Sequence, residues 1–183
     1  MCCSFVLRNL ALVARRDEDT RSSCARSGAR RPGLAYVDRY LVCHVGVHAC
    51  ALPLTCVIET MRPQPVETLS GTPGFVLGMS IIRGVAVPVV DAAGLLGSKT
   101  KPIRFVTIRA GSGVAALATG DVMGVRALGD ALLERTSPLL GELARDVVTA
   151  VAAADRRLVL VLETSRIVPA AVWDLLQPGD VTQ

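Results

Sequence analysis

Short apolar segments of strand length recur along this chain from Tyr36 onward, each separated from the next by turn-forming residues. Roughly ten such segments at regular spacing are typical of β-barrels and β-sandwiches. No long helical pattern alternates with them, as a parallel α/β fold would require. The sequence therefore predicts an all-β fold. The strands expected from the pattern are 40–45, 49–54, 75–82, 85–91, 103–108, 114–118, 122–128, 147–152 and 158–162.

Turn chemistry and composition define the remaining elements. The first two segments, joined at 46–48, predict a hairpin, and a second set of strands begins at Ile103. Pro138 interrupts a stretch with helix-forming composition, so 129–143 is expected to be a loop with a short helical turn. Residues 169–176 predict a terminal helix in which Trp173 is the packing anchor.

Charge and hydropathy exclude two classes of partner. Seven arginines and three acidic residues lie in 1–35, whereas the remainder of the chain holds 13 basic and 13 acidic residues. Because the charges of residues 36–183 cancel, this part lacks the basic face of a nucleic-acid-binding domain. Only 3% of the chain is aromatic, so it also lacks side chains on which bases could stack. No apolar run approaches the roughly 18 residues of a membrane-spanning helix. We expect no nucleic acid and no direct membrane insertion.

The cysteines and histidines form the most reactive-looking set in the sequence. No C-x-x-C pair is present, and a zinc site would have to straddle the 46–48 turn with Cys43 and His44 on opposite faces of one strand. We therefore expect no metal and no cofactor, and reduced thiols that behave as small buried hydrophobes. A thiol-dependent enzyme or a small-ligand-binding barrel remains the alternative, with its reactive residue among Cys43, Cys50 and Cys56.

The segment 75–97 contains the most informative motif. Two apolar runs flank an Arg83-Gly84 pair that predicts a tight turn, and Pro88 lacks a ladder donor, which favours an edge or a bulge. Arg83 could be a solvated turn residue or an ion-pair partner of Asp91. Its apolar neighbours and its planar fork of five donors also suit an interface anchor.

These residues, from Ile82-Arg83-Gly84 to Val87-Pro88-Val89-Val90-Asp91, resemble the signature of the CheW-like family of bacterial chemotaxis coupling proteins. The resemblance implies two five-stranded SH3-like barrels with a groove between them and a short C-terminal helix. It also implies a short helical turn and then a strand within 55–62. The implied function is that of a non-catalytic, cytoplasmic adaptor, recruited to receptor arrays at the inner membrane. Its partners would be the regulatory domain of a CheA-type histidine kinase and the cytoplasmic tip of a chemoreceptor.

The resemblance assigns a receptor-binding groove to two segments of this chain. Val57, Met61 and Val85 would offer apolar contact to a helical hairpin tip, while Arg83 and Glu59 would supply polar ends. The complete set is Val57, Glu59, Met61, Arg83, Gly84 and Val85. The kinase would meet strand edges of the barrels.

Two departures from the family pattern and three boundaries complete the expectations. Gly120 replaces an acidic residue, and Ile81 replaces a polar residue two positions before the arginine. The predicted domains are 1–35 as an extension outside the core, 36–176 as the CheW-like domain and 177–183 as a tail. A membrane-surface or partner-binding peptide is an alternative interpretation of 1–35.

Overall fold

The structure is a computed structural model that describes residues 39–128, 132–133, 146–154 and 157–176. The expectations for 1–35 and 177–183 therefore lie outside the described residues, as does most of the loop expected at 129–143. Within that loop the structure describes a two-residue strand, β9 (Leu132–Leu133), and the rest of the stretch in which a helical turn is expected lies outside the described residues.

Sheet A has six strands in the order β8-β1-β2-β11-β10-β9. It combines the first two strands of the described chain with the last four, and its only parallel pair is β2 with β11. Its longer strands are β1 (Arg39–Val45), β2 (His48–Pro53), β8 (Val122–Ala127), β10 (Val148–Ala154) and β11 (Arg157–Leu162).

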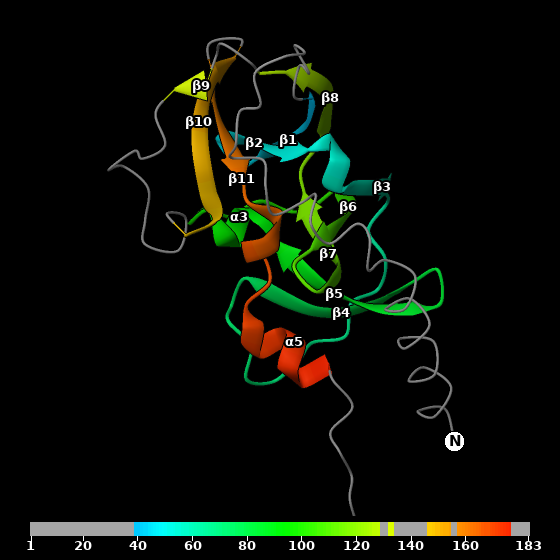
Figure 1. The fold of residues 1–183 in the computed structure, drawn as a ribbon. Coiled ribbons are helices and arrows are strands. Elements are labelled where there is room, and N and C mark those ends of the chain that lie inside the picture. The colour runs from blue at the N-terminus through cyan, green and yellow to red at the C-terminus, as the bar shows by residue number, and fades with distance from the viewer. Residues whose placement is uncertain (1–38, 129–131, 134–145, 155–156, 177–183) are drawn as a thin grey trace, which may run out of the picture.

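Sheet B has five strands in the order β3-β6-β7-β5-β4 and is built entirely from the middle of the chain. Here β5 and β7 run parallel, while the other neighbours are antiparallel. Figure 1 shows sheet A at the top of the view and sheet B below it. The strands are β3 (Val57–Met61), β4 (Val76–Ile82), β5 (Val85–Asp91), β6 (Arg104–Ala110) and β7 (Gly113–Thr119).

The helical part is small. A 3-10 turn, η1 (Leu54–Cys56), leads into β3, and α3 (Ala92–Leu95) begins directly after β5. A second turn, η3 (Thr164–Arg166), follows β11 and leads to α5 (Ala170–Leu176). Trp173 of α5 packs against the β6–β7 hairpin, because a Cβ built on Gly113 would lie 2.9 Å from its ring. The expected terminal helix with a tryptophan anchor is confirmed.

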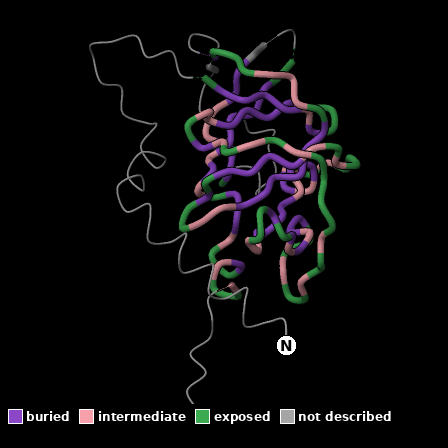
Figure 2. Tube along the Cα trace, turned by 90° about the vertical axis from the view of Figure 1, so that its right-hand side faces the viewer, coloured by how far each residue is buried: buried purple, intermediate pink, exposed green. Residues whose placement is uncertain are grey.

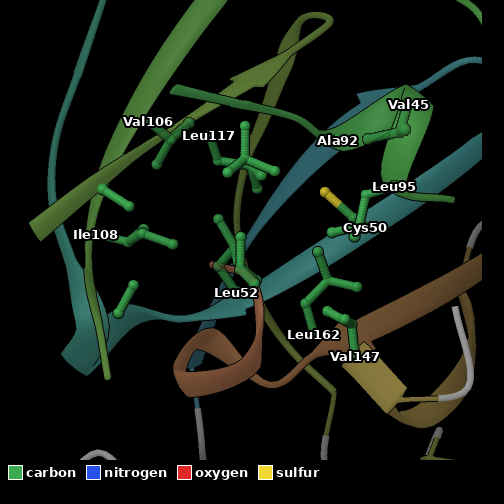
Figure 3. Packing of buried hydrophobic residues seen from close by; sticks show 14 of the residues in the cluster. Val45, Cys50, Leu52, Ala92, Leu95, Val106, Ile108, Leu117, Val147 and Leu162 are labelled. Carbon is green, nitrogen blue, oxygen red and sulfur yellow. The ribbon is translucent and has the colours of Figure 1, made fainter. Parts of the chain in front are cut away.

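Buried hydrophobic side chains form three groups, and Figure 2 shows buried positions running through the interior of the fold, with the exposed ones mostly at its periphery. One group lies within sheet A and one within sheet B. The largest, which we call the inter-sheet cluster, combines residues of both sheets. In Figure 3, Leu52 of sheet A lies between Ile108 of sheet B on one side and Leu162 of sheet A on the other, all within this cluster. The region between the sheets is therefore a packed apolar core.

Strands that bury both faces explain the apolar runs in the sequence. In β1, Leu41, Cys43 and Val45 join the inter-sheet cluster, while Tyr40 and Val42 join the cluster of sheet A. Burial on both faces replaces alternation by a continuous hydrophobic run.

The all-β prediction with two small sheets and a short C-terminal helix is confirmed, with β9 as an additional sixth strand of sheet A. The helical turn and strand implied within 55–62 are also present, as η1 and β3. The second set of strands expected from Ile103 is present as β6, β7 and β8, of which β6 and β7 pair within sheet B and β8 returns to sheet A.

The placement of Pro88 on an edge or at a bulge was wrong. Pro88 lies in β5, an interior strand between β7 and β4. Its missing donor is tolerated there because the parallel ladder with β7 includes only Val89 to Asp91, beyond the proline. The bulge of this hairpin lies in β4, between Val76 and Gly78.

Over the described ranges, no helix has the length and apolar character needed to span a lipid bilayer.

Candidate functional site

The turn between β4 and β5 holds the most informative residues of the chain in an unusual conformation. Arg83 has φ 51° and Gly84 has φ 79°, and positive φ at both central residues is what a type I′ hairpin turn requires. Glycine adopts this conformation easily, but for arginine it is disfavoured. Among the described residues, Arg83 alone has positive φ without being glycine. The arginine at this position is therefore not explained by turn preference.

The side chain of Arg83 makes a two-point ion pair with Glu59 of β3. Its Nε donates to Oε1 at 2.7 Å, and its Nη2 donates to Oε2 at 2.6 Å. This fork-to-fork geometry is the strongest arrangement of the pair. The hydrogen bond from Arg83 lowers the pKa of Glu59, and the hydrogen bond to Glu59 raises the pKa of Arg83. Both groups are therefore charged over the physiological range.

The pair joins two distant parts of sheet B. Glu59 lies in β3, one edge strand, whereas Arg83 directly follows β4, the other edge strand. An ion pair across the two edges is compatible with the curled sheet of an SH3-like barrel. The backbone oxygen of Glu59 also accepts from Thr107 Oγ1 at 3.3 Å, which fixes β3 against β6. Arg83 is still 78% exposed, and Glu59 is 25% exposed.

The alternative pairing of Arg83 with Asp91 was wrong. Asp91 instead caps α3, since its Oδ1 accepts a hydrogen bond from the Ala93 amide at 3.0 Å. A carboxylate in this position satisfies one of the unpaired donors at the start of a helix. The sequence offered no signal for the Glu59 partnership, because 24 residues separate the two side chains.

The structure places the other four candidate residues around these two strands. Met61 and Val85 both pack against the apolar cluster of sheet B, and Gly84 is exposed in the turn. Val57 packs instead against the inter-sheet cluster. Of the six candidates, two form the ion pair and two pack against the sheet B cluster, whereas Val57 lies at the start of β3 and packs against the inter-sheet cluster.

Two of the described cysteines, Cys43 and Cys50, face each other inside sheet A. Cys43 and Cys50 are directly opposite each other in the β1–β2 register, and both are 0% exposed. Hydrogen bonding to Cys43, reinforced by burial, raises the pKa of Cys50, while the same hydrogen bond lowers the pKa of Cys43 against the effect of burial. Inaccessible thiols of this kind are inert. The expectation of reduced thiols was wrong for Cys56, which is disulfide-bonded.

Nor do the described residues bring together three potential metal ligands. His44 instead lies against the Arg157 guanidinium, with Nη1 3.4 Å from Nδ1. The backbone of His44 bonds to the chain that crosses from β7 to β8, since Gly120 N donates to its oxygen at 2.9 Å. A Cβ on Gly120 would lie 2.8 Å from that oxygen, so the departure from the family pattern at Gly120 accompanies a close backbone approach.

Comparison with known proteins identifies a family model and two similar proteins. Residues 39–172 match the model of the CheW-like domain family. A probable chemotaxis protein CheW from Rhizobium etli is 23% identical over 131 residues, which cover 69% of this chain and 84% of that protein. The crystal structure of the scaffolding protein TtCheW from Thermoanaerobacter tengcongensis superimposes with a TM-score of 0.59 at 20% identity. That match covers 68% of this chain and 88% of the other. The chain belongs to the CheW-like domain family.

Proposed function

We propose that this protein is a non-catalytic adaptor that couples chemoreceptors to a chemotaxis-type histidine kinase. The observation that carries the proposal is the pairing of Arg83 with Glu59 at the exposed edge of a CheW-like fold. A relative described as a scaffolding protein, with the same fold, supports the same role. The proposed location is the cytoplasm, at receptor arrays on the inner membrane.

The receptor-facing surface in this proposal consists of Val57, Glu59, Met61, Arg83, Gly84 and Val85. Arg83 occupies a turn position that asparagine would suit better, and a residue kept against backbone preference is often functional. Its guanidinium uses two donors on Glu59, and its high exposure leaves the outer face of the group open to a partner. The tip of a helical hairpin would contact this polar group and the adjacent apolar side chains.

The kinase-facing surface in this proposal is the edge of sheet A formed by β8. This strand pairs with β1 on one side and, within the described ranges, has no strand on the other. Its last three residues are exposed, including Val125 at 47%. An open edge offers backbone donors and acceptors to a similar edge of a partner barrel. The two proposed surfaces lie on different sheets, so one chain could hold both partners.

Calorimetry with the full chain tests the assignment. We expect the wild-type protein to bind a receptor-tip fragment and, separately, the regulatory domain of the kinase. Arg83→Asn keeps a residue that tolerates positive φ but removes the guanidinium. It should weaken binding of the receptor tip by about tenfold or more, as expected for an interface anchor, and leave kinase binding unchanged.

Two further variants, a second test and a control, complete that experiment. Glu59→Gln should weaken tip binding in the same direction, because it releases Arg83 from its two-point contact. Arg104→Asn removes another arginine of sheet B, whose Nη1 donates to the backbone oxygen of Ile103, and should have no effect on tip binding. Equal binding of the tip to wild type and Arg83→Asn would refute the assigned surface.

A further inference from the structure

The loop between α3 and β6 lies against one end of sheet A and contacts it at two points. Near its start, a Cβ built on Gly46 in the β1–β2 turn would lie 2.7 Å from Ser98 Oγ and 3.2 Å from Thr100 Oγ1. At its end, the Ile103 amide donates to the backbone oxygen of Thr119 at 2.9 Å, where the chain leaves β7 for β8. The loop therefore runs from the β1–β2 turn to the entry of β8.

Basic side chains gather at this end of sheet A. Lys99 and Lys101 are exposed on the loop, and Arg104 begins β6 directly after it. Arg157 of β11 is exposed as well, and its Nη1 lies 3.4 Å from Nδ1 and 3.5 Å from Nε2 of His44. The Arg157 guanidinium thus reaches across to β1, the strand that pairs with β8.

The local charge differs from that of the folded part as a whole. The segments that meet at this end are 44–48, 98–104, 119–122 and the start of β11 at Arg157. Together they hold four basic residues and one acidic residue, Asp121, so their net charge is +3. Residues 36–183 hold equal numbers of basic and acidic residues, so the charges are separated within the fold. A local excess of this sign attracts an anionic partner.

These basic residues adjoin the edge of β8 that the proposed function gives to the kinase. Asp121 directly precedes β8, and its backbone oxygen accepts from the His44 amide at 2.8 Å. The basic residues therefore lie where the open edge begins. A partner strand added to β8 would continue past them, so an acidic segment next to that strand would be attracted and a basic one repelled. A polypeptide, unlike a lipid surface, can pair with the backbone of the edge and with these charges together.

We propose that Lys99, Lys101, Arg104 and Arg157 form a basic patch that recruits an acidic segment of the regulatory domain of the kinase, next to the strand that pairs with β8. This inference rests on the proposed function and adds to it an electrostatic determinant of partner choice. Charges at the rim of an interface change the association rate constant more than the dissociation rate constant.

Stopped-flow mixing of the full chain with the regulatory domain of the kinase measures both rate constants. Lys99→Gln/Lys101→Gln should lower the association rate constant about tenfold at low salt and keep the dissociation rate constant within about threefold of wild type. Lys99→Arg/Lys101→Arg keeps both charges and should associate as wild type does. Arg62→Gln/Arg109→Gln removes the same charge from exposed positions in and beside sheet B and should change association by less than about twofold. Circular dichroism checks that each variant folds.

A salt series gives an independent readout. The association rate constant of wild type should fall about tenfold between about 50 and 500 mM salt, and that of Lys99→Gln/Lys101→Gln by less than about threefold, because salt screens charges that the variant lacks. Association that neither salt nor the double glutamine variant slows would overturn the basic patch. A variant that loses binding only to vesicles of anionic lipid would overturn it too. Failure of the wild-type protein to bind the regulatory domain at any salt would refute the proposed function instead, so the two failures are distinguishable.

Discussion

At the scale of single residues, one polar side chain of sheet B is buried without a hydrogen-bond partner among the described residues. Ser80 of β4 is 2% exposed, and its hydroxyl has no hydrogen-bond partner among the described residues. The buried hydroxyl of Thr107, by contrast, donates to the backbone oxygen of Glu59. A buried polar group without a partner lowers stability by about 1–3 kcal/mol relative to an apolar replacement.

We therefore expect Ser80→Ala to leave the free energy of unfolding unchanged or to raise it by about 1 kcal/mol. Thr107→Val is the matched control, because it removes a hydroxyl that is paired and should destabilise the protein by about 1 kcal/mol. Urea unfolding of both variants measures the difference. A clear loss of stability in Ser80→Ala would show that the hydroxyl has a partner in solution.

The Glu59 carboxylate gives a second prediction at this scale. The hydrogen bond from Arg83 lowers its folded-state pKa, so its stabilising contribution is complete above the ordinary pKa of a glutamate, about 4.3. The contribution is lost as the pH falls through the lower folded-state pKa. The stability difference between wild type and Glu59→Gln should thus be constant from pH 6 to 8 and should shrink in acid. Thermal unfolding across this range checks the trend, and a difference that grows in acid would contradict the ion pair.

At the scale of elements, β4 requires glycine at a position within the strand, away from the hairpin turn. Gly78 has φ 136° and lies in the bulge of the strand, where Glu67 and Met79 exchange two backbone hydrogen bonds of 2.8 Å. A Cβ at Gly78 would overlap the carbonyl oxygen of Glu67. This close approach covers part of the outer edge of β4.

Gly78→Ala should consequently destabilise the protein by about 3 kcal/mol or more, because strain from positive φ and a clash with backbone act together. Gly84→Ala provides the comparison: its φ is also positive, but no atom lies within 4 Å of the added Cβ. Its effect should be limited to about 1 kcal/mol. Denaturant unfolding compares the two, and equal losses would argue against the clash at Glu67.

The same scale shows how far the sequence can predict this fold. Hairpins such as β1–β2 and β4–β5 follow from local turns, and α5 follows from its composition and Trp173. Parallel pairs such as β5–β7 and the partnership of Glu59 with Arg83 do not, because they join residues remote in sequence with no local signal. The prediction for Pro88 failed for the same reason, because an interior strand tolerates proline only where the parallel ladder has not yet begun.

At the scale of the whole molecule, the chain passes from sheet A to sheet B and back to sheet A. Sheet A is complete only when strands from before and after sheet B come together, and the inter-sheet cluster contains residues of both sheets. Val172 of α5 belongs to that cluster and Trp173 packs against it. The two sheets should consequently unfold as one unit.

We expect a single cooperative transition, with the same midpoint by far-ultraviolet circular dichroism and by the fluorescence of Trp173, the one tryptophan of the chain. Trp173→Phe serves as the control that identifies the fluorescence signal. Two separate transitions would contradict the interleaved core.

The measurement that tests the central claim most directly is sedimentation velocity of the full chain mixed with the regulatory domain of the kinase and a receptor-tip fragment. The proposed surfaces lie on different sheets, so we predict a ternary species that sediments faster than either binary complex. Arg83→Asn should remove the tip from that species and keep the kinase domain. Binary complexes alone, with the two partners displacing each other, would contradict the account of this protein as an adaptor.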